Sequence, residues 1–119
     1  MAFLSDKDSE KIKNDLKELI NDKLLNGFEN RKFQPVVSVD SVDVEYDIDT
    51  NESDRDNIIV RPVKAVARVW VTGRQPGSKS KNNLDLLINN PVVFSFDDNE
   101  KSYVLQDSDK VVMINMTQD

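Results

Sequence analysis

Basic residues are concentrated in one stretch of an otherwise acidic chain. The 119 residues carry a net charge of −6, yet residues 58–83 contain cations and no acid. These cations are Arg61, Lys64, Arg68, Arg74, Lys79 and Lys81. Charges separated in this way favour recognition of an oppositely charged surface. The chemistry that this stretch indicates is therefore binding.

Acidic residues alternate with apolar ones just before the basic stretch. Asp43, Glu45, Asp47 and Asp49 occupy every second position, so a strand would place them on one face at intervals of about 6.6–7 Å. Three interpretations follow. In the first, the acids pair with cations of a neighbouring strand. In the second, they contact the cations of another copy of the protein. In the third, they imitate DNA phosphates in a small acidic inhibitor of a nucleic-acid enzyme.

The residues for most catalytic chemistry are missing. The chain has no histidine and no cysteine, which excludes Ser–His and Cys–His nucleophiles, ordinary zinc sites and disulfides. Asp47 begins an imitation of a calcium-binding loop, but Glu52 and Ile58 replace the glycine and the glutamate that such a loop needs. Carboxylates alone could still form a hydrolase or metal site, yet alternating acids are usually a solvated face. We expect no enzyme, no cofactor and no metal.

Protein subunits are the expected partners, as a homo-oligomer or within a larger assembly. Nucleic acid is disfavoured because the whole chain is negative and residues 73–83 contain no aromatic side chain for base stacking. A membrane is not expected, because no run of about 18 apolar residues occurs. The N-terminus does not resemble a signal peptide, and we expect a cytoplasmic or virion location.

The pattern of apolar residues predicts an α+β domain spanning residues 1–119. Residues 5–26 are predicted to form an amphipathic helix capped by Ser5, with an apolar stripe of Ile12, Leu16, Leu19, Ile20 and Leu24. The helix is expected to pack on a mainly antiparallel sheet of about five or six strands that ends in a β-meander. The expected strands are 36–48, 58–72, 84–88, 92–96, 102–106 and 111–116, although 84–88 could instead be a short helical turn.

The strand at 58–72 has two different faces. Between Val63 and Thr72 its odd positions are small and apolar, which suits packing under a helix, and its even positions include Lys64, Arg68 and Trp70. Antiparallel pairing with 36–48 places Lys64 opposite either Asp43 or Glu45. A bulge is expected near residues 36–41.

Residues 73–83 are predicted to form a mobile basic loop that contacts a partner. The candidate contacts in this loop are Arg74, Lys79 and Lys81. Trp70 is either a core residue or an interface anchor. The other candidate interface residues are Arg68, Asp43, Glu45 and Asp47.

The order of elements resembles that of small bacteriophage neck and tail-completion proteins. The shared layout is an N-terminal amphipathic helix, a long strand hairpin with a protruding loop and a closing β-meander. This resemblance implies a structural protein that forms ring contacts at a head–tail junction or tail end. No residue motif accompanies it, so it transfers no functional residue.

Overall fold

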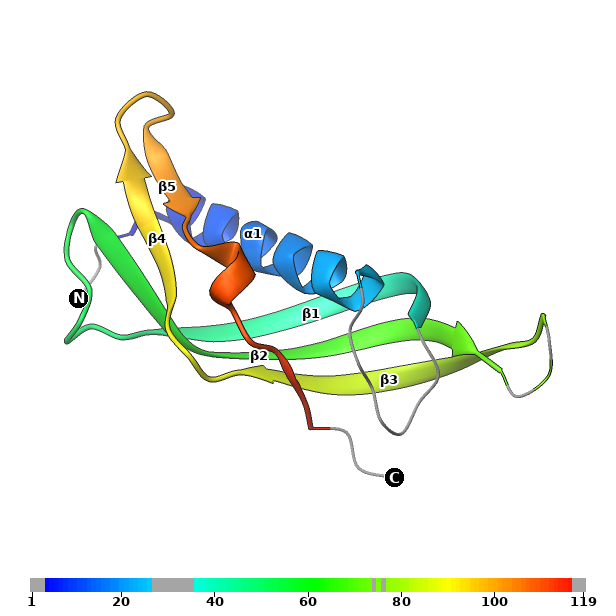
Figure 1. Cartoon of the computed structure of the whole chain (residues 1–119). Helices are drawn as coiled ribbons and strands as arrows, with labels where there is room; N and C mark the ends of the chain where they lie inside the picture. The colour runs from blue at the N-terminus through cyan, green and yellow to red at the C-terminus, as the bar shows by residue number, and fades with distance from the viewer. Residues whose placement is uncertain (1–3, 27–35, 74, 76, 117–119) are drawn as a thin grey trace.

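The computed structural model describes residues 4–26, 36–73, 75 and 77–116. A single helix, α1 (Asp6–Leu25), lies on one face of a six-stranded sheet (Figure 1). The strands are β1 (Val36–Ile48), β2 (Asn57–Thr72), β3 (Lys79–Ile88), β4 (Val92–Asp97), β5 (Ser102–Leu105) and β6 (Ile114–Asn115). Every strand pair among them is antiparallel. The predicted fold class is confirmed.

Strand β2 is the centre of the sheet. It pairs with β1 over most of its length, with β4 through residues 57–60 and with β3 through residues 63–72. Arg61 and Pro62 fall between the β4 and β3 ladders. A proline fits there because it has no N–H to donate to a ladder.

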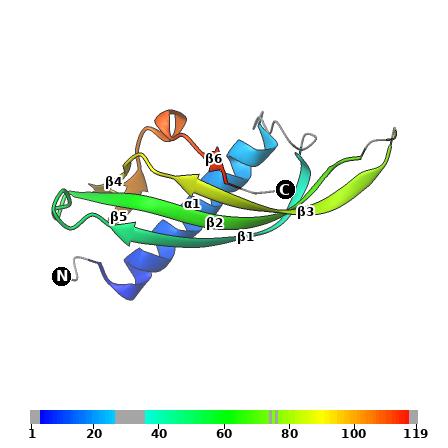
Figure 2. The same ribbon diagram turned by 90° about the horizontal axis from the view of Figure 1, so that it is seen from below.

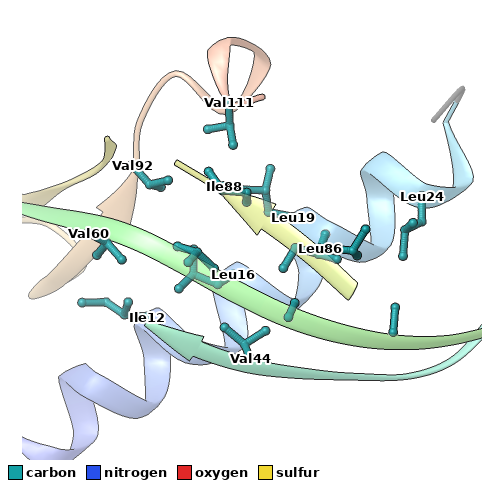
Figure 3. Packing of buried hydrophobic residues seen from close by; sticks show 14 of the residues in the cluster. Ile12, Leu16, Leu19, Leu24, Val44, Val60, Leu86, Ile88, Val92 and Val111 are labelled. Carbon is teal, nitrogen blue, oxygen red and sulfur yellow. The ribbon is translucent and has the colours of Figure 1, made fainter. Parts of the chain in front are cut away.

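Helix α1 supplies the apolar layer that covers the sheet. Its predicted cap is confirmed, since Ser5 Oγ accepts a hydrogen bond from the Asp8 N–H at 3.1 Å. All five residues of its predicted stripe are buried. They meet the small odd-numbered side chains of β2, together with residues of β3, β4 and the segment at Val111 (Figure 3).

Two polar contacts fix the helix to the sheet. The Tyr46 hydroxyl of β1 donates to the Ser9 carbonyl at 3.1 Å, and the Lys11 ammonium donates to the Tyr103 carbonyl of β5 at 2.9 Å. The helix is therefore tied both to an edge strand and to the β4–β5 hairpin.

The pairing of β1 with β2 follows one of the two predicted registers. Glu45 lies opposite Lys64, and Val44 lies opposite Ala65. The register shifts between Val36 and Ser38 and again between Val39 and Ser41, which confirms the expected bulge. Across both shifts Val36, Val39 and Val42 still pack against the core, whereas Val37 is exposed.

The prediction of a mobile loop at residues 73–83 is wrong for the second half of this range. Strand β3 begins at Lys79, with Lys79 opposite Thr72 and Lys81 opposite Trp70. The β2–β3 hairpin extends beyond the end of α1 (Figure 1). Residues 79–81 are exposed in succession, so this part of the strand has no buried face to give its sequence an apolar alternation.

The turn of this hairpin is short and hydrogen-bonded. The Gly73 N–H donates to the Ser78 carbonyl at 2.7 Å, and the Ser78 N–H donates to the Gln75 carbonyl at 3.0 Å. The Ser78 hydroxyl also donates to the Gln75 carbonyl at 2.7 Å. An added methyl group at Gly73 would collide with Ser78 Oγ, so alanine at this position requires the Ser78 side chain to move out of its hydrogen bonds.

The end of the chain also differs from the predicted meander. The β4–β5 hairpin forms as expected, but the predicted strand 111–116 is reduced to β6, which pairs with β3 instead of β5. A short 3₁₀ helix (Ser108–Lys110) redirects the chain. The side chain of Asn90 then holds the next segment, accepting from the Val112 N–H at 3.2 Å and donating to the Lys110 carbonyl at 3.3 Å. These local bonds replace a regular ladder.

Across the described ranges, no helix has the length and hydrophobicity that crossing a membrane would require.

Candidate interaction face

The sheet has a second face that no described element covers. We call it the open face; Figure 2 shows it in front of α1. Its members alternate with the buried positions of three adjacent strands, and β6 adds one residue. They are Ser41, Asp43 and Glu45 of β1, Lys64, Val66, Arg68, Trp70 and Thr72 of β2, Lys79, Lys81, Asn83, Asp85 and Leu87 of β3, and Ile114 of β6.

The charges of the open face are partly sorted along the strands, with two exceptions: Lys64 lies among the acids, and the Asp40 carboxylate lies 3.6 Å from the Lys81 ammonium group among the cations. One row across the sheet is Asp43, Val66 and Asp85, so a valine lies between two carboxylates. The adjacent row toward the hairpin turn contains Arg68. Beyond it follow Lys81, beside Trp70, and Lys79, beside Thr72. We call the two parts the acidic half (Asp43, Glu45, Lys64, Val66, Asp85 and Leu87) and the basic half (Arg68, Trp70, Thr72, Lys79, Lys81 and Asn83).

Three charged residues of this surface form no ion pair with another described residue: Glu45, Lys64 and Arg68. Glu45 lies opposite Lys64 in register, as predicted, but no ion pair joins their side chains within the described part of the chain. Arg68 likewise has no ion-pair partner among the described residues. The interpretation that the acids of β1 form ion pairs with cations of the neighbouring strand is therefore wrong for Lys64 and Arg68. The charges stay exposed to solvent and accessible to a partner.

Lys81 differs from these residues, because it has contacts within the molecule. Its ammonium group lies 3.6 Å from the Asp40 carboxylate and 6.0 Å from the centre of the Trp70 ring. A cation over an indole face is a favourable arrangement. Trp70 is half-buried on the open face and lies outside the buried core. Lys81, a predicted partner contact, therefore also has contacts within its own chain.

The acidic half is hollowed into a groove of about 670 Å³. Its apolar surface comes from Val66, Leu87 and Met116, and its carboxylates come from Asp43, Glu45 and Asp85. The remaining lining residues are Lys13, Val44, Lys64, Ala65 and Leu86. Val66 is 40% exposed and Met116 is 53% exposed. An apolar groove with acidic walls is suited to a side chain that combines apolar surface with a positive charge.

A second, shallower depression of about 420 Å³ lies in the basic half. Arg68, Lys81, Asn82 and Asn83 line it. Its lining consists of cationic and amide groups, which donate hydrogen bonds to carboxylates. The two depressions thus have opposite chemical character on one continuous surface.

The structure brings most of the predicted interface residues together. Six of the predicted interface residues lie on the open face: Asp43, Glu45, Arg68, Trp70, Lys79 and Lys81. Asp47 is exposed at the irregular end of β1, and the prediction for Arg74 lies outside the described residues. Prediction from sequence missed the roles of Asp85, Leu87 and Met116, because strand pairing alone brings these residues beside Val66.

Only two ionisable groups in the described ranges have a resolved pKa shift, and neither lies on the open face. Burial raises the pKa of the Tyr46 phenol, and burial together with the nearby Asp8 carboxylate raises the pKa of the Tyr103 phenol. Both hydroxyls donate to backbone carbonyls, Tyr103 to Arg55 at 2.8 Å. These tyrosines connect elements of the fold.

Comparison with known proteins found no matching family model, no matching curated protein and no matching solved structure. The resemblance to phage neck and tail-completion proteins stays a prediction.

Proposed function

We propose that this protein is a non-catalytic assembly protein that binds other protein subunits through its open face. The observation that carries the proposal is the open face, which combines exposed apolar side chains with both acids and cations. Among these charged residues, Glu45, Lys64 and Arg68 form no ion pair with another described residue. Protein interfaces combine apolar anchors with complementary charges in this way. A phage neck or tail is one setting that the layout resemblance suggests for such an assembly.

The alternative function is a small acidic inhibitor that imitates DNA. The alternating acids of β1 support it, since Asp43, Glu45 and Asp47 are all exposed. However, Lys64 lies directly beside Glu45, and Arg68 lies in the row next to Asp43. These cations interrupt the negative surface that a DNA mimic presents, so we favour the assembly function.

Light scattering over a range of protein concentrations tests the proposal. We expect the unmodified protein to exceed its monomer mass of 13.6 kDa and the double variant Arg68→Glu/Lys79→Glu to be shifted toward that mass. Arg55→Glu is the matched control, because Arg55 is exposed in the loop between β1 and β2. Circular dichroism verifies that each variant folds. A monomer at every concentration, up to about 1 mM, would refute the assembly function.

A further inference from the structure

We infer that the open face binds the open face of a second copy, with a two-fold axis running across the strands between the rows of Val66 and Arg68. This inference rests on the proposed function and names the partner and the geometry. The result is a closed dimer in which the same surface is used by both copies.

Charge complementarity selects the second copy as the occupant. A two-fold axis across the strands reverses the strand direction of the partner, so the acidic half of each copy meets the basic half of the other. An axis parallel to the strands would instead place the acidic half of each copy against the acidic half of its partner, because such an axis keeps every row at the same level along the strands. Opposed carboxylates repel each other. The first arrangement brings the cations of the basic half onto the partner's acidic half, while Asp40 stays paired with Lys81 of its own copy.

The register of the sheet then assigns specific contacts. Arg68 of one copy lies over Val66 of its partner, beside the Asp43 carboxylate in the same row. A guanidinium group is suited to this position because its planar donors bind carboxylates and its stem covers apolar surface. Trp70 of one copy lies over the row of Lys64 and Glu45, at the edge of the apolar groove. Two-fold symmetry produces each contact twice.

The size of the open face suits a weak dimer. Its members span residues 41–45 of β1, 64–72 of β2 and 79–87 of β3, which at about 3.3 Å per residue and about 4.8 Å between strands cover roughly 360 Å² in projection. Two copies together reach about 700 Å², which is in the range of weak, transient interfaces. The exposed apolar side chains on this side, Val66 at 40% and Ile114 at 44%, then lose contact with water. Aromatic and arginine side chains such as Trp70 and Arg68 are typical anchors of interfaces.

Two charge-reversed proteins test the geometry. The first carries Asp43→Lys and Glu45→Lys in the acidic half, and the second carries Arg68→Glu and Lys79→Glu in the basic half. Each variant alone faces like charge in the dimer, so we expect its dissociation constant to rise at least about tenfold relative to the unmodified protein. An equimolar mixture restores opposite charges at both ends of the interface. We expect the mixture to recover a species of twice 13.6 kDa at about 0.15 M salt, where net-charge effects are screened.

The outcomes separate the inference from the proposed function. A wild-type dimer together with recovery in the mixture supports both. An unmodified protein that assembles beyond a dimer, or a mixture of folded variants that does not recover the dimer, overturns the two-fold geometry and leaves the assembly function intact. A wild-type protein that stays monomeric at every concentration overturns both. Arg55→Glu mixed with the unmodified protein is the control and should leave the dimer unchanged.

Discussion

Replacing Leu16 by alanine tests the layer on which the open face depends. Leu16 is fully buried at 0% exposure between α1 and the sheet. The change removes about three carbons, worth roughly 2.4 kcal/mol in lost burial. The cavity left behind adds to this, so we expect a loss of about 3–4 kcal/mol in the free energy of unfolding. That is a large part of the 5–15 kcal/mol that stabilises a typical domain.

Leu25→Ala is the matched control, because it is the same substitution in the same helix at a residue that is 45% exposed. It should cost no more than about 1 kcal/mol, since roughly half of the side chain already contacts water. Urea unfolding followed by circular dichroism measures both values, at a protein concentration low enough to keep the chain monomeric. Equal losses for Leu16→Ala and Leu25→Ala would refute the packing of α1 on this face of the sheet.

Two further changes test the elements that frame the open face. Tyr103→Phe removes the hydrogen bond to the Arg55 carbonyl and should cost about 0.5–1.5 kcal/mol in urea unfolding. Burial raises the pKa of the Tyr103 phenol above 10.0, so the folded state favours the neutral phenol. The stability that this preference contributes is complete below about pH 10 and falls as the pH rises through the raised pKa. Tyr103→Phe should therefore weaken the alkaline loss of stability, and an unchanged pH profile would contradict this role. Gly73→Ala should accelerate amide hydrogen exchange in the β2–β3 hairpin by about tenfold, because the new methyl group collides with Ser78. Ser80→Ala, on the exposed part of β3, is the control. Equal exchange rates in the two variants would contradict the tight turn.

The sequence predicts the elements that have one buried face. The stripe from Ile12 to Leu24 in α1 and the alternation around Val44 and Ala67 in the first two strands each reflect contact with a single apolar layer. That same alternation limited the register to two choices, because the apolar faces of β1 and β2 had to coincide. The structure follows the choice that places Glu45 opposite Lys64.

The sequence does not predict elements that lack a buried face. Lys79, Ser80 and Lys81 form a strand because the hydrogen bonds of the hairpin hold them, while their side chains remain in solvent on both faces. In contrast, the apolar segment after Val111 resembles a strand, yet the side-chain bonds of Asn90 hold its start outside the sheet. Apolar content alone cannot distinguish these cases.

The composition of the candidate site was predictable only in part. Charge counting identified Arg68, Lys81 and the acids of β1. Asp85 and Leu87 lie in the candidate site because β3 pairs with β2 in one particular register. That register depends on a hairpin turn which the sequence alone suggested to be a long loop.

Chemical footprinting of lysines tests most directly the claim that the open face is the assembly surface. Lys64 on the open face and Lys7 near the start of α1 are both exposed in the single chain. We expect acetylation of Lys64, measured by mass spectrometry, to slow as the protein concentration rises through the assembly range, while acetylation of Lys7 proceeds at a constant rate. Acetylation of Lys64 that stays constant while the mass in solution increases would show that another surface assembles, and would contradict this account.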